Sequence, residues 1–118
     1  MQFSNILLAA LIPYASASCN SGGNEWGSEA AALAKQACDN LLSGDYGPSN
    51  TYNGGKSTCF NHNNEKYEFQ IWHIKDGYRN LSPAECLDGL TKETNCKHGG
   101  KSSYANWKYR ADPNAGAC

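Results

Sequence analysis

Six cysteines constrain the fold of this 118-residue chain more than any other feature of its sequence. An even count in a short chain is typical of a disulfide framework, which supports a core too small to be stable alone. The chain has no C-x-x-C pair, and its three histidines lie far apart in the sequence, so we expect no metal site and no cofactor. We therefore predict three disulfides among Cys19, Cys38, Cys59, Cys86, Cys96 and Cys118.

The N-terminal segment predicts export from the cell. Its apolar run, 6–12, has the length of the hydrophobic region of a signal peptide and is too short to span a bilayer. Ala15-Ser16-Ala17 supplies a cleavage site of the A-x-A type. We predict a signal peptide over residues 1–17 and one secreted, extracellular domain over residues 18–118, a length that holds a single core. No later segment is apolar enough for membrane insertion.

The charge pattern argues against a nucleic acid as partner. The formal net charge is −1, and the lysines and arginines are scattered instead of forming a basic run. Tryptophan, tyrosine, asparagine and glycine are prominent instead, and this mixture favours the recognition of neutral polar ligands. The oligomeric state does not follow from these features.

Two segments have the pattern of helices. Residues 28–42 carry alanine and leucine at three- and four-residue spacing, with Ser28 as N-cap and Gly44 beyond the C-terminal end. The run Ser82-Pro83-Ala84-Glu85 combines an N-cap, a proline at the first helical position and a capping-box glutamate. We expect this second helix to end near Asn95.

Strands are predicted over 56–61 and 66–74, joined in a hairpin, while 45–55 is expected to be a loop. One or two strands are expected after the second helix, with a long strand over 101–111. Both helices are then available to cover one face of an antiparallel sheet, which predicts an α+β two-layer sandwich. The covered face is expected to pack Tyr67, Phe69 and Ile71 against Leu33, Leu41 and Leu87.

The other sheet face is the preferred binding site. Sugars stack their C–H faces on aromatic rings while their hydroxyls donate and accept hydrogen bonds, which suits amide and charged side chains. Strand alternation assigns to this face Glu68, Gln70, Trp72, Tyr104, Asn106, Lys108 and Arg110. The glycine-rich loop, with Tyr46, Tyr52 and Asn53, is a second candidate. Trp26 and His73 are interpreted as packing residues.

Four short motifs together resemble one family. They are Ser21-Gly22-Gly23-Asn24, Gln36-Ala37-Cys38, Ala84-Glu85-Cys86 and the terminal Cys118. In this order and spacing they resemble the killer-toxin-like family of secreted fungal proteins, which includes the smut-fungus killer toxin, necrosis-inducing effectors and an ink-cap mushroom glycan-binding lectin. The resemblance covers nearly the whole mature chain.

This resemblance implies an αββαββ sandwich, in agreement with the order of elements above, and the pairs Cys19–Cys96, Cys38–Cys86 and Cys59–Cys118. It implies a toxin or a lectin. The smut toxin is basic and has more disulfides, whereas this chain is slightly acidic, so the lectin branch is favoured. The expected partner is a cell-surface glycan, bound in defence or antagonism, and the alternative is a toxin or effector acting on a protein such as an ion channel.

A third alternative is a small guanyl-type ribonuclease, because Tyr67-Glu68-Phe69 in a strand resembles that class. Glu68, His73 and Arg110 would act as base, acid and phosphate ligand. However, Glu68 and His73 differ in strand parity and should point to opposite faces. We therefore expect a binding protein without enzymatic activity.

Overall fold

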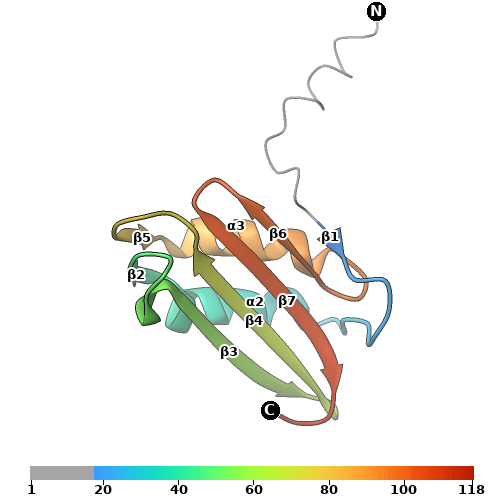
Figure 1. The fold of residues 1–118 in the computed structure, drawn as a ribbon. Coiled ribbons are helices and arrows are strands. Elements are labelled where there is room, and N and C mark those ends of the chain that lie inside the picture. The colour runs from blue at the N-terminus through green and yellow to red at the C-terminus, as the bar shows by residue number, and fades with distance from the viewer. Residues whose placement is uncertain (1–17) are drawn as a thin grey trace, which may run out of the picture.

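A computed structural model describes residues 18–118, apart from the side chain of Tyr104, and the predicted signal peptide lies outside this part. Two helices, α2 (Ala30–Ala37) and α3 (Pro83–Thr94), cover one face of an antiparallel sheet (Figure 1). The strand order is β1-β6-β7-β4-β3. Their bounds are β1 Ser18–Cys19, β3 Gly55–His62, β4 Glu65–His73, β6 Gly100–Tyr104 and β7 Trp107–Ala115. This is the predicted α+β fold.

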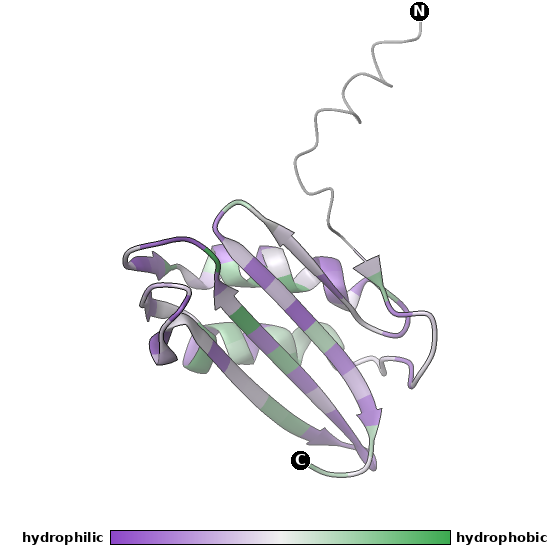
Figure 2. Ribbon diagram, in the orientation of Figure 1, coloured by the Kyte–Doolittle hydropathy of each residue, from purple (hydrophilic) through white to green (hydrophobic). Residues whose placement is uncertain are grey.

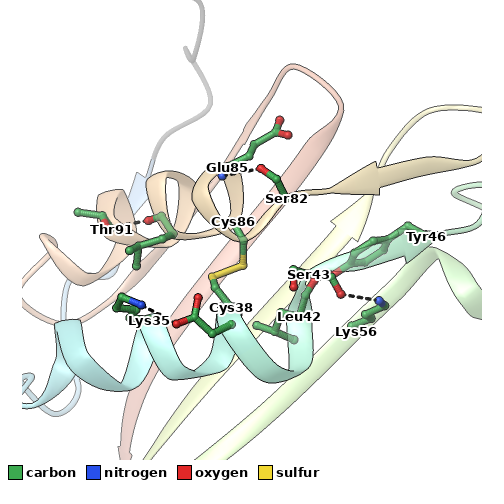
Figure 3. The surroundings of a disulfide bond; sticks show 12 residues. Lys35, Cys38, Leu42, Ser43, Tyr46, Lys56, Ser82, Glu85, Cys86 and Thr91 are labelled. Atoms are coloured by element: carbon green, nitrogen blue, oxygen red, sulfur yellow. Dashed lines mark hydrogen bonds and ion pairs between the residues drawn. A yellow bond between two sulfur atoms is a disulfide. The ribbon is translucent and has the colours of Figure 1, made fainter.

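Three disulfides hold the sandwich together. They join Cys19 to Cys96, Cys38 to Cys86 and Cys59 to Cys118, the pairs that the family resemblance implies. Figure 3 shows the middle bridge between the end of the first helical segment and the first turn of α3. The bridges close loops with sequence separations of 77, 48 and 59. In the chain-entropy model each such bridge stabilises the fold by about 4 kcal/mol.

Strand alternation divides the central strands into two faces. Polar and apolar residues alternate along β4 (Figure 2), and Tyr67, Phe69 and Ile71 are fully buried under the helices. Trp26 stacks on Phe69 with 5.9 Å between ring centroids and meets Tyr67 edge-on at 4.8 Å. The predicted burial of the three β4 residues, the packing of Leu33 and Leu87 against this core and the packing role of Trp26 are therefore confirmed.

The first helix differs from the prediction at both ends. Glu29 is its N-cap in place of Ser28, and α2 passes at Cys38 into a π-helical turn that runs to Leu42. A π-helical turn contains one extra residue, which delays the buried face by one position. Leu42 is consequently buried, whereas Leu41 is 51% exposed, so the predicted core role of Leu41 is wrong.

The second helix agrees with its sequence signal. The Ser82 hydroxyl accepts a hydrogen bond from the Glu85 backbone N–H at 3.1 Å, and Asn95 is the C-cap. No helix among residues 18–118 has the length and apolar character needed to cross a membrane.

Two strands follow α3, where the sequence predicted one or two, and the single long strand over 101–111 does not form. The chain turns back at Ala105, whose φ is +54°, and forms the hairpin of β6 and β7. In this hairpin Tyr104 pairs with Trp107, and Lys108 pairs with Ser103. Asn106 lies in this turn, where its carbonyl accepts from the backbone N–H of Ile74.

The predicted loop over 45–55 contains more structure than expected. Its start belongs to β2 (Gly44–Tyr46), which pairs with β5 (Arg79–Leu81) in a separate two-stranded sheet. Its end forms a short 3-10 turn, Tyr52–Gly54, that leads into β3. These two additions lie at the end of the sheet where β3 begins and β4 ends.

Candidate functional site

A groove of about 840 Å³ lies where β3 and β4 meet the segment 47–54. Its floor includes Gln70 and Trp72 of the open sheet face, and its walls come from β2, segment 47–54 and the start of β3. Leu41 and Tyr78 complete the rim. Two residues of the predicted open face, Gln70 and Trp72, therefore share one groove with the residues predicted in the glycine-rich loop, Tyr46, Tyr52 and Asn53.

Exposed apolar side chains gather around this groove. Tyr52 is 97% exposed, Tyr78 is 83% exposed and Leu41 is 51% exposed, and all three line it. Among the side chains that the structure describes, no other large hydrophobic one is exposed. Apolar side chains that gather on one exposed surface mark a binding site more often than a plain solvated face.

Trp72 is held between two cross-strand neighbours, Gly55 on β3 and Lys108 on β7. A Cβ atom at Gly55 would lie 2.8 Å from Cδ1 of the indole, so only glycine leaves room for the ring to lean over β3. The Lys108 ammonium lies 5.3 Å from the ring centroid, within range of a cation–π interaction. Lys108 therefore supports the indole without lining the groove.

The segment 47–54 is tied down on several sides. The Gly47 N–H donates to the Asn53 carbonyl at 2.9 Å, and the Ser49 N–H donates to the Lys75 carbonyl at 3.1 Å. A Cβ atom at Gly54 would lie 2.6 Å from the Pro48 carbonyl oxygen, so the turn closes tightly on itself. Tyr52 is therefore presented by a preformed wall.

His73 holds this segment in place from the covered face of the sheet. Its ring is 1% exposed, and Nδ1 lies 2.8 Å from the Gly47 carbonyl oxygen. A carbonyl only accepts, so Nδ1 carries the proton and donates. His73 is buried and hydrogen-bonded, as its alternation with Phe69 and Ile71 suggested.

The charged groups of the groove wall have partners within the protein. Asp45 accepts from the Asn80 amide at 2.9 Å. The Lys56 ammonium donates to the Ser43 carbonyl at 3.1 Å and lies 4.4 Å from the Tyr46 ring centroid (Figure 3). Burial raises the pKa of the Tyr46 phenol, whose hydroxyl donates to the Leu42 carbonyl at 2.6 Å, so this ring stays neutral.

The remaining predicted ligand residues lie elsewhere. Gln70 and Trp72 line the groove, whereas Glu68 and Arg110 belong to a polar row further along the open face. The Asn114 amide donates to Glu68 at 3.0 Å, and Arg110 donates to Gln70 at 2.6 Å and to Asp112 at 2.7 Å. Sequence reasoning missed Tyr78 as a groove residue, although Asp76-Gly77 just before it is a turn signal.

The nominated ribonuclease residues do not converge. Glu68 belongs to the open face and His73 to the covered face of the same strand, and Arg110 is engaged by Gln70 and Asp112. Among residues 18–118 no three histidine, cysteine, aspartate or glutamate side chains gather as metal ligands.

A second hollow of about 400 Å³ lies at the hairpin between β3 and β4. Its wall is polar, and its side chains largely bond to the protein: Glu65 accepts from Asn24 at 2.7 Å, and Asn61 accepts from the Cys118 N–H at 2.8 Å. No exposed aromatic ring lines it. The Trp72 groove is therefore the better candidate site.

Comparison with known proteins identifies a glycan-binding family. No curated protein matches the chain. The family model described as glycan binding domain Y3 matches residues 29–118, which include both helices and the strands that form the groove. The chain thus belongs to the glycan binding domain Y3 family, and it is a lectin-like glycan-binding protein.

Proposed function

We propose that this protein is a secreted fungal lectin that binds cell-surface carbohydrate through the groove around Trp72, in defence or antagonism. The observation that carries the site is the gathering of Tyr52, Tyr78 and Leu41 around the half-buried Trp72. Aromatic faces beside amide groups match the alternating C–H and hydroxyl surfaces of a sugar.

Export and fungal origin belong to the same proposal. Three disulfides favour an oxidising, extracellular compartment, and the A-x-A site after the apolar run favours cleavage before Ser18. The killer-toxin-like resemblance of the cysteine motifs favours a fungal source. Mass measurement of the protein from culture medium tests the predicted mature domain over residues 18–118, and a product that retains residues 1–17 would contradict it.

The binding proposal is tested with a printed glycan array and the oxidised protein. Trp72→Ala should weaken binding about 30-fold, or ~2 kcal/mol, because it removes the largest ring that the groove offers. Asn64→Gly is the matched control, since it alters the second hollow and glycine tolerates the φ of +65° at this position. An array without hits, or equal binding by the Trp72 variant, would overturn the proposal.

A non-catalytic role is tested on the same material. Glycans recovered after incubation should have unchanged masses, and RNA should remain intact. If the protein inhibits the growth of a target organism, free sugar should compete with that effect. Inhibition that survives sugar competition would favour a protein target instead.

A further inference from the structure

We infer that the open sheet face beside the groove binds an anionic group, a sulfate or a carboxylate, carried by the glycan. The contact surface is a basic row on β1, β6 and β7, which consists of Ser18, Lys101, Lys108 and Arg110. This inference rests on the proposed function and goes beyond it by naming a charged substituent and a second contact surface outside the groove.

The fold brings together cations that are scattered in the sequence. Lys101 of β6 lies opposite Arg110 of β7. Lys108 of β7 lies opposite Ser103. The intervening Ser102 is buried against the helices, so Lys101 and Ser103 point to the open face. Figure 1 shows β6, β7 and β4 side by side in front of the two helices. These cations therefore share one solvent-facing surface.

Removal of the predicted signal peptide adds another charge to the row. Ser18 of β1 is exposed and lies directly opposite Lys101. Cleavage before Ser18, which belongs to the proposed function, leaves a free α-amino group there, and such a group is positively charged at neutral pH. The row of the mature protein therefore extends over three neighbouring strands.

The charges of the row are not balanced within the protein. Like charges directly opposite each other on a sheet are destabilising, and Lys101 has Arg110 on one side and the new N-terminus on the other. Arg110 forms an ion pair with Asp112 at 2.7 Å. Among residues 18–118, no carboxylate lies within ion-pair distance of Lys101 or Lys108. A bound anion would relieve this repulsion.

The row continues directly into the floor of the groove. Lys108 lies opposite Trp72, and Arg110 lies opposite Gln70 and donates to it at 2.6 Å. Neighbouring strands are about 4.8 Å apart, so a substituent on a sugar at Trp72 reaches β7 and then β6 within roughly 10 Å. The row is therefore placed to contact a ligand that the groove already holds.

The groove itself does not supply a free cation. Lys56, the lysine that lines it, donates to the Ser43 carbonyl at 3.1 Å and lies over the Tyr46 ring. A single exposed ion pair contributes little to binding, whereas several cations around one anion act together. An anionic substituent is therefore expected on the row and not within the groove.

The test uses an array of matched glycan pairs that differ in a single sulfate or carboxylate, and the oxidised protein that begins at Ser18. In about 0.1 M NaCl the anionic member of a pair should bind about tenfold more tightly. In about 1 M NaCl, where the Debye length is about 3 Å, the two members should bind nearly equally. Equal affinity at the lower salt concentration, or a preference that persists at the higher one, would overturn the inference.

Substitutions at Lys101 test the row without touching the groove. Lys101→Gln should reduce the preference for the anionic member to about threefold, and Lys101→Glu should abolish it, while the affinity for the neutral member stays unchanged. Lys35→Gln is the matched control, because it removes the same charge from α2 on the other side of the sheet. A preference that Lys101→Glu leaves intact, or that Lys35→Gln lowers equally, would contradict the inference.

Two further measurements separate this inference from its alternatives. Vesicles of phosphatidylcholine and phosphatidylserine present anions without a glycan and should not bind the protein. Vesicle binding that Lys101→Glu abolishes would assign the row to a membrane surface and overturn the inference. If Trp72→Ala weakens the binding of neutral glycans but the unaltered protein shows no anionic preference, the proposed function stands and this inference is wrong. If no glycan of either kind binds, both fail.

Discussion

Two tryptophans on neighbouring strands of the sheet differ in their exposure to solvent. Trp72 on β4 pairs with Lys108, and Trp107 on β7 pairs with His73, so the two side chains leave the sheet on opposite faces. Trp107 is fully buried, with its ring centroid 4.9 Å from that of Tyr46. Trp72 is only half-buried and lines the groove. The same residue type therefore supports the fold on one face and is offered to a ligand on the other.

The largest difference between the two faces should appear in stability. Trp107→Ala should lower the free energy of unfolding by about 4 kcal/mol, because it leaves a cavity among Tyr46, His73 and the helices. Trp72→Ala should cost less than about 1 kcal/mol, since the ring is partly solvated already. Urea unfolding of the oxidised proteins measures both values. Similar losses for the two variants would mean that Trp72 is a structural residue as well.

His73 connects the two faces, because it is buried on the covered side yet holds the groove wall through Gly47. His73→Leu should lower the free energy of unfolding by about 2 kcal/mol, since the buried carbonyl then lacks a donor. It should also weaken glycan binding and speed amide hydrogen exchange over 47–54. His73→Asn keeps a donor near the position of Nδ1 and should restore part of both properties. Leucine and asparagine variants that behave alike would show that the hydrogen bond is unimportant.

A smaller effect is expected where the open face makes room for its tryptophan. Gly55→Ala places a methyl group 2.8 Å from the indole and should displace the ring, with about a tenfold loss of glycan affinity, or ~1.4 kcal/mol. The backbone there is extended, with φ −139°, so alanine adds no backbone strain. Gly22→Ala is the control, because a Cβ atom there meets nothing within 4 Å. Equal affinity for the two variants would show that the position of the indole is not critical.

The alternation that separates the two tryptophans was readable from the sequence, and so were the second helix and the core of β4. Period-two patterning and the Ser82 capping box are local signals, and the structure realises them directly. The packing role of Trp26 and the buried state of His73 followed from the same patterns.

The missed features depend on contacts that local patterns do not encode. The π-helical turn after α2 shifts Leu41 out of the core. The spacing of alanine and leucine does not indicate that this turn contains an extra residue. The turn at Ala105 has a non-glycine residue at positive φ. The strand-like alternation of the sequence continues through this position and therefore does not indicate a turn. Tyr78 lies at the groove with Tyr52 and Trp72, next to β5, which pairs with the distant segment β2. Local sequence patterns do not predict such a pairing.

The smallest predicted effect concerns a carboxyl group on the covered side of the sheet. Glu93 of α3 is 1% exposed and accepts a hydrogen bond from the Ser102 hydroxyl. Burial raises the pKa of Glu93, although that hydrogen bond and the charge of Lys92 lower it in part. The folded protein therefore holds this proton at a higher pH than the unfolded chain does. Stability should fall as pH rises from the ordinary carboxyl pKa toward the raised value.

Glu93→Gln removes this proton equilibrium and keeps the shape of the side chain. At neutral pH the variant should be more stable by about 1 kcal/mol, the usual cost of an incompletely satisfied buried polar group. Near pH ~4 the advantage should vanish, because the Glu93 carboxyl of the unaltered folded protein is then protonated and as neutral as the glutamine amide. Ser102→Ala should steepen the pH dependence, since the hydroxyl that favours the carboxylate is gone. Urea unfolding across this pH range measures the trend. A glutamine variant with a constant advantage would show that ionisation of Glu93 carries no stability cost.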